Sequence, residues 1–166
     1  YVDNLIITGE EHFLEAKKRP GGLLLIGGHF SIFDLALPFF ASKLDKPGYM
    51  YRPNDNPVID RTIEKGRRRH YGIKPFDKKS LKDMFTFIQD GGQVWYAVDQ
   101  DFGNKCEVFA PFFGVQAGCI TAPSWIARES GATVMVVSQF RHPNGQYEIA
   151  FSPILDNFGK DEQADA

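Results

Sequence analysis

Apolar and polar residues follow one another along this chain in a pattern that predicts strands separated by helices. Continuous apolar runs at 23–26 and 94–98 are typical of strands buried on both faces of a sheet. Segment 78–90 instead spaces its apolar residues as an amphipathic helix does. Because helices intervene between most of the strands, the sheet is expected to be largely parallel. The turn between 133–140 and 147–151 predicts one antiparallel hairpin at the C-terminal end.

The expected elements alternate along the whole chain. We expect strands at 2–8, 23–26, 49–51, 94–98, 133–140 and 147–151, and helices at 9–18, 31–43, 57–71, 78–90 and 120–130. Asn56 and Pro57 form a good N-cap and first-turn pair for the third helix. Segment 108–113 is too short to assign. The order predicts an α/β/α sandwich, a mostly parallel sheet flanked by helices, in a single domain over residues 1–166.

The net charge of the chain limits the classes of molecule that it could bind. The 166 residues carry a formal net charge of −2, which gives no overall attraction to nucleic acid or to anionic lipid. Any anionic partner must therefore meet a local patch, and the basic segment 65–69 provides one. Cys106 and Cys119 have neither zinc nor redox spacing, which favours a reducing compartment.

No apolar run reaches the length needed to cross a bilayer. The chain nevertheless opens on Tyr1 and ends in the acidic segment 160–166. We therefore expect it to be part of a longer protein.

His29 is the strongest candidate for a general base. Asp34 lies five residues later, and on one continuous helix the two side chains would be about 140° apart and could not meet. The histidine must therefore precede the helix, with Gly27 and Gly28 allowing a tight turn. Asp34 could then hold the Nδ1 proton and leave Nε2 free to accept one. The alternative is a histidine that only caps or hydrogen-bonds a loop.

Two basic segments are candidates for anion binding. The turn-rich loop 51–57 contains two prolines, which restrict its backbone and would hold Arg52 in a fixed position. Arg52 could bind a phosphate or polarise an oxyanion, or it could form an ordinary salt bridge to Asp55 or Asp60. Segment 66–69 could bind an anion or simply cap the C-terminal end of its helix.

Asp99 and Asp101 follow the strand expected at 94–98. They could bind acceptor hydroxyls or fix Arg52 at the carboxyl end of the strand. Their spacing does not continue as a calcium loop, so no metal site is expected. The chain also lacks a nucleophile elbow and a phosphate-binding P-loop, which disfavours covalent serine catalysis and ATP-driven chemistry.

Four sequence blocks resemble the late acyltransferases of lipid A biosynthesis, which belong to the lysophospholipid acyltransferase superfamily. They are Gly-His-Phe-Ser-Ile-Phe-Asp at 28–34, Tyr-Arg-Pro-Asn-Asp-Asn-Pro at 51–57, Gly-Arg-Arg-Arg at 66–69, and Val-Trp-Tyr-Ala-Val-Asp-Gln-Asp-Phe-Gly at 94–103. The first block contains the superfamily hallmark, His, four residues, then an acid. The second and fourth blocks are much more specific, and all four occur in the family's order. The phospholipid branch typically has Glu-Gly-Thr where this chain has Asp99-Gln100-Asp101 in its fourth block, so these acids favour the lipid A branch.

The resemblance implies a glycerolipid acyltransferase-like fold and a reaction. His29 would deprotonate a hydroxyl of a lipid A precursor, with Asp34 orienting the imidazole, and the oxygen would attack the thioester of an acyl-acyl carrier protein. No cofactor and no metal would be needed. The implied place of action is the cytoplasmic face of the bacterial inner membrane. The residues expected to bind the substrates are Arg52, Asn54, Asn56, Arg67, Arg69, Asp99 and Asp101.

The chain departs from the family in two ways. Family members usually have Glu at the position of Asp34, and their N-terminal membrane helix and C-terminal region are absent here. Two other functions stay open: acylation of a lysophospholipid or another lipid alcohol, and lipid binding without catalysis.

Overall fold

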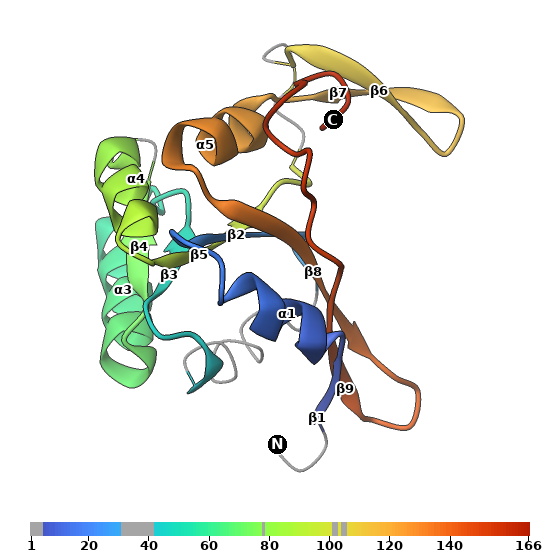
Figure 1. Cartoon of the computed structure of the whole chain (residues 1–166). Coiled ribbons are helices and arrows are strands. Elements are labelled where there is room, and N and C mark those ends of the chain that lie inside the picture. Colours follow the sequence, from blue (N-terminus) through green and yellow to red (C-terminus); the bar gives the residue numbers. More distant parts are fainter. Residues whose placement is uncertain (1–4, 31–41, 78, 101–102, 104–105) are drawn as a thin grey trace.

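The computed structural model describes residues 5–30, 42–77, 79–100, 103 and 106–166 (Figure 1). Within these residues, seven strands form one sheet in the order β1-β9-β8-β2-β5-β3-β4. They are β1 (Leu5–Thr8), β2 (Leu23–Gly27), β3 (Pro47–Met50), β4 (Lys74–Phe76), β5 (Gln93–Ala97), β8 (Thr133–Arg141) and β9 (Tyr147–Phe151). The described helices are α1 (Glu10–Ala16), α3 (Pro57–Tyr71), α4 (Leu81–Gln89) and α5 (Ala122–Ser130).

Strand β2 lies at the centre of the sheet, and all five of its residues are buried. It runs parallel to β5 on one side and to β8 on the other. Strand β3 pairs in parallel with β5 and with β4, and β1 pairs in parallel with β9. Strands β8 and β9 pair antiparallel. The expected mostly parallel sheet with a C-terminal antiparallel hairpin is therefore confirmed.

Helices cover both faces of the sheet, as the α/β/α prediction requires. On one face, Phe13 and Ala16 of α1 pack with Leu23 and Leu25 of β2. On the other, α4 and α5 pack against the alternate positions of the same strand. Because successive side chains of a strand point to opposite faces, one apolar run supplies both cores.

A second, two-stranded sheet was not expected. Strands β6 (Val108–Phe112) and β7 (Val115–Cys119) pair antiparallel and project away from the rest of the molecule at the upper right of Figure 1. Phe113 and Gly114 form the turn, both with positive φ, as a tight hairpin turn requires. The sequence prediction left 108–113 unassigned and missed both β7 and β4. The helix expected at 31–43 falls almost entirely outside the described residues.

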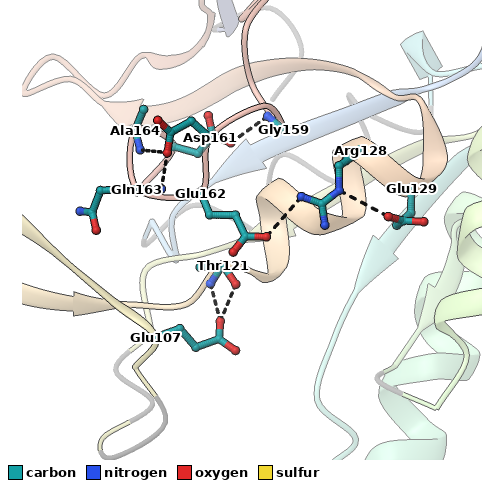
Figure 2. A network of polar contacts seen from close by, with 10 residues as sticks. Glu107, Thr121, Arg128, Glu129, Gly159, Asp161, Glu162, Gln163 and Ala164 are labelled. Carbon is teal, nitrogen blue, oxygen red and sulfur yellow. Dashed lines mark hydrogen bonds and ion pairs between the residues drawn. The ribbon is translucent and has the colours of Figure 1, made fainter.

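Polar contacts join the C-terminal segment to α5 (Figure 2). Arg128 donates to Glu162 at 3.3 Å and to Glu129 at 3.4 Å. The backbone N–H and the hydroxyl of Thr121, at the start of α5, both donate to Glu107 at 2.7 Å. These hydrogen bonds lower the pKa of Glu107. The base of the β6–β7 hairpin and the C-terminal segment thus both attach to one helix.

Candidate active site

Candidate residues gather at the carboxyl edge of the sheet. Strands β2, β5 and β3 are parallel neighbours, so their carboxyl ends lie along one edge. His29, Asp99 and Arg52 each follow one of these strands. Reactive groups of open parallel sheets collect at this edge, as the sequence predicted.

His29 and Asp99 form the closest contact at this edge. Nδ1 of His29 lies 2.6 Å from Oδ1 of Asp99, and the backbone N–H of His29 donates to Oδ2 of the same carboxylate at 2.7 Å. The two side chains are 49% and 48% exposed, so the pair is open to a substrate. The carboxylate thus fixes both the position of the histidine backbone and the orientation of its ring.

Gly28 makes this contact sterically possible. A Cβ at this position would lie 3.0 Å from Oδ2 of Asp99, tighter than ordinary van der Waals contact. At Gly27, a Cβ would lie 2.8 Å from the carbonyl oxygen of Val137. Neither glycine has a positive φ. The two glycines are therefore needed for close approach, not for the turn freedom that the sequence suggested.

The environment keeps Asp99 ionised. Partial burial on its own would raise the pKa of this carboxyl, but hydrogen bonds from the His29 ring, from the His29 backbone and from its own backbone outweigh that effect and lower the pKa. An ionised Asp99 accepts the Nδ1 proton of a neutral imidazole, which leaves a lone pair on Nε2. The side-chain amide nitrogen of Gln100 lies 3.5 Å from Nε2, too far for a strong hydrogen bond. Nε2 is therefore able to accept a proton.

An aromatic side chain contacts the imidazole directly. The buried ring of Trp95 meets it edge to face, with ring centroids 6.3 Å apart. Phe30, the next residue along the chain, lies 6.1 Å from Phe140 of β8, and both rings are partly exposed. An accessible apolar surface therefore begins at the residue that follows the histidine.

Arg52 is paired away from the histidine. Its guanidinium donates to Asp55 at 3.3 Å, and both side chains are more than four-fifths exposed. Such an exposed pair contributes little stability, so the guanidinium can exchange partners. Among the described residues, Arg52 makes no recorded contact with Asp99, so the suggestion that Asp99 fixes Arg52 gains no support.

Asn54 and Asn56 have clear structural roles. Asn56 is the N-cap of α3, as predicted, and its side-chain oxygen accepts from the backbone N–H groups of Val58 and Ile59. Asn54 accepts from the backbone of Asn56 and donates its own N–H to Asp60 at 2.8 Å. The side chains of both residues therefore stabilise the loop that leads into α3.

Arg67 and Arg69 belong to the last turns of α3. The Arg67 guanidinium lies over the ring of Tyr49, 4.9 Å from its centroid. Burial raises the pKa of Tyr49, and the nearby Arg67 opposes that rise. Arg69 is exposed. Arg67 therefore lies against β3.

Two predicted site residues, Asp34 and Asp101, lie outside the described residues. The role predicted for Asp34, holding Nδ1 of His29, is performed by Asp99 among the residues that the structure does describe. Sequence reasoning missed this pairing and the neighbouring Gln100. The signal in the sequence was that both residues follow buried strands; their adjacency comes from the parallel pairing of β2 with β5, which brings residue 29 beside residue 99. The described residues contain no cluster of three or more potential metal ligands and no helix able to span a membrane.

Comparison with known proteins agrees with the resemblance seen in the sequence. The family model for bacterial lipid A biosynthesis acyltransferases matches residues 2–166. The chain belongs to this acyltransferase family. It is 37% identical over 150 residues to the lipid A biosynthesis lauroyltransferase of Escherichia coli K12, an alignment that covers 89% of this chain and 48% of that protein.

Two other family members show the same coverage. A lipid A biosynthesis acyltransferase of Haemophilus influenzae is 33% identical over 149 residues, 87% of this chain and 47% of that protein. The palmitoleoyltransferase of E. coli K12 is 26% identical over 165 residues, 94% of this chain and 51% of that protein. The chain thus spans about half the length of these acyltransferases.

Proposed function

We propose that this chain carries the catalytic base of an enzyme that transfers a fatty acyl group from acyl-acyl carrier protein to a hydroxyl of a lipid A precursor. The observation that carries the proposal is the His29–Asp99 pair at the carboxyl edge of the sheet, with Nε2 open. Membership of a family whose relatives are named lipid A acyltransferases supports the choice of acceptor. The proposed place of action is the cytoplasmic face of the inner membrane.

The reaction requires one proton to move twice. Nε2 of His29 takes the proton of the acceptor hydroxyl as that oxygen attacks the thioester carbonyl carbon. The tetrahedral intermediate then collapses, the C–S bond breaks, and the imidazolium returns the proton to the leaving thiolate. The products are an ester and the free thiol of the carrier, so no cofactor is consumed. Asp99 stabilises the imidazolium between the two transfers.

Asp34 remains a proposed catalytic residue as the acid of the His-x4-Asp motif, and we add Asp99 as a second proposed positioning residue. The imidazole has only two ring nitrogens, and Nε2 must face the acceptor. If Asp99 holds Nδ1, Asp34 must act on the ring or its surroundings in another way. Substituting each acid separately distinguishes the two roles.

The other predicted site residues supply binding. Arg52 is exposed beside the sheet edge, and its partner among the described residues is the exposed Asp55, so a phosphate of the acceptor could displace that carboxylate. The partly exposed surface of Phe30 and Phe140 is a candidate wall for the acyl chain. Arg67, Arg69 and Asp101 remain proposed substrate-binding residues.

The test is to incubate the protein with acyl-acyl carrier protein and an under-acylated lipid A precursor, and to follow the mass of the acceptor. We expect a gain of one acyl group that disappears in His29→Ala. His12→Ala, on the surface helix α1, is the matched control and should keep full activity. Transfer only to a lysophospholipid would reassign the acceptor, and lipid binding without any transfer would reject the catalytic proposal.

A further inference from the structure

Helix α3 turns its aliphatic side chains away from the protein. Val58, Ile59 and Ile63 are 71%, 47% and 41% exposed, although aliphatic residues of a surface helix normally face the core. At 100° per residue, these three side chains lie within about 140° of arc, together with Thr62 and Gly66. The helix therefore presents these three aliphatic side chains as one stripe to its surroundings.

The opposite side of α3 is polar and faces the protein. Asp60 accepts a hydrogen bond from the backbone of Asn54, and Arg67 lies over Tyr49 of β3. Asp60, Glu64 and Arg67 are each only partly exposed. Charged residues thus occupy the side on which a globular protein usually places apolar ones. This inverted amphipathicity indicates an apolar environment on the outer side.

Basic side chains border the apolar stripe. Helix α3 contains five basic residues and two acidic ones, for a charge of +3, whereas the whole chain has −2. The rest of the chain therefore carries −5. Of the basic residues, Arg61, Lys65 and Arg69 are exposed and lie on one edge of the stripe or within it. The positive charge is thus concentrated where the apolar residues emerge.

We propose that the outer face of α3 docks on an anionic bilayer surface, with the aliphatic stripe at the acyl boundary and Arg61 and Lys65 among the headgroups. An amphipathic helix with basic residues beside its apolar face has this mode of binding. A second copy of the chain is a poor occupant, because a twofold contact through α3 would bring its basic residues against their own copies. An acidic protein would pair with the charges but would leave the stripe of β-branched residues unexplained.

The docking face also suits the position of the candidate site. Helix α3 begins directly after the loop 51–56, which leaves the carboxyl edge of the sheet that holds His29 and Asp99. Its first turn, with Val58 and Ile59, is therefore the part of the helix nearest that edge along the chain. Docking α3 would bring the site edge to the bilayer, where a lipid acceptor lies. This last step rests on the proposed function, whereas binding to the bilayer does not.

The competing exposed surface is the β6–β7 hairpin. Phe112, Phe113 and Val115 are 65%, 93% and 71% exposed. Segment 108–119 contains no charged residue, so nothing in its chemistry selects a lipid surface over a protein. It serves as a control rather than as the proposed site.

The experiment measures partition of the chain onto vesicles of phosphatidylcholine with and without phosphatidylglycerol. We expect binding that depends on phosphatidylglycerol. Ile59→Gln/Ile63→Gln should weaken it by on the order of tenfold, because apolar surface no longer leaves water. Arg61→Gln/Lys65→Gln should weaken it by about fivefold per charge removed, and added salt should abolish that difference. All four side chains are exposed, so the variants should fold.

Control variants elsewhere on the protein distinguish α3 from the other exposed surfaces. Two variants away from α3 should leave partition unchanged. One is Leu14→Gln, whose side chain on α1 is 51% exposed. The other is Lys79→Gln/Lys82→Gln, which removes two exposed charges next to and on α4. The inference is overturned if the wild type does not bind, or if Phe112→Ser/Phe113→Ser releases the chain while the α3 variants stay bound. It is also overturned if the α3 variants bind vesicles as the wild type does and lose only affinity for acyl carrier protein. The same holds if their only effect is to convert a dimer of the chain into monomers.

Acyl transfer to a detergent-dispersed acceptor separates this inference from the proposed function. The α3 variants should keep that transfer and lose transfer to acceptor in vesicles. If the wild type transfers nothing but binds vesicles through α3, the proposed function fails and the docking inference stands.

Discussion

At the scale of single residues, the site depends on one carboxylate that makes two contacts with one histidine. Asp99 receives both the backbone N–H and the ring of His29, and Gly28 is the residue whose lack of a side chain leaves room for it. The same hydrogen bonds lower the pKa of Asp99. A group with a lowered pKa stabilises the fold at pH above its unfolded value and loses that contribution as the pH falls through its folded value. The pair is therefore kept at neutral pH and lost only in acid.

We predict that Asp99→Asn lowers kcat by between about 10²- and 10⁴-fold with little change in KM, because an amide neither fixes the ring as firmly nor stabilises the imidazolium. Steady-state kinetics of the wild type and the variant measure both constants.

Asp34→Asn provides the comparison for this experiment. It should also lose rate with little loss of stability if the His-x4-Asp motif acts as proposed. A variant at Asp99 with a normal kcat would limit that residue to structure. A pH–rate profile of the wild type that is flat from about pH 5 to pH 8 would argue against a histidine base.

At the scale of elements, a small polar cluster joins the first strand to the last. Thr8 of β1 donates to Glu148 of β9 at 2.7 Å, and His142 contacts the other carboxylate oxygen at 2.7 Å. The hydrogen bonds from Thr8 and then from His142 lower the pKa of Glu148 below its ordinary 4.5. Strand β1 pairs with β9 at the edge of the sheet, so this cluster holds an element with neighbours on one side only.

We predict that Glu148→Gln removes part of the acid sensitivity of the fold. The stabilisation from Glu148 is fully present above pH 4.5 and is lost as the pH falls through the lowered folded value. The variant should therefore be less stable than the wild type at neutral pH, and the gap should narrow below pH 4.5. Urea unfolding at a series of pH values measures it, with the exposed Glu11→Gln as the control. A gap that stays constant with pH would contradict the assignment.

At the scale of the whole molecule, the segment after β9 contributes to both cores. Ile154 packs against the cluster on the α1 side, and Phe158 packs against the cluster on the side of α4 and α5. The side chains that form the ion pairs of Arg128 in Figure 2 are all more than two-fifths exposed. Exposed ion pairs contribute little, so packing rather than charge should hold the segment.

We predict that Phe158→Ala lowers the free energy of unfolding by roughly 2 kcal/mol, because a partly buried ring is removed from a packed cluster. Arg128→Ala should leave the unfolding midpoint nearly unchanged. Thermal and urea unfolding of the two variants distinguish packing from charge. The opposite ranking would show that the polar network of Figure 2 holds the segment.

The sequence alone determined the α/β class, the central strands, the N-cap of α3 and the positions of His29 and Asp99 at strand ends. These features depend on local patterns, such as apolar runs, capping residues and motif spacing, which act within a few residues of the chain. The short strands β4 and β7 were missed because three to five residues of mixed polarity carry little periodic signal.

Only the tertiary structure decided which carboxylate meets His29 and which way α3 faces. Residues 29 and 99 are far apart along the chain, and they meet because β2 and β5 pair in parallel with matched ends. The spacing between His29 and Asp34 could suggest a partner, but no spacing could reveal one on another strand. The outward stripe of α3 is likewise a property of packing, since a helix has the same periodicity whichever face it turns to the sheet.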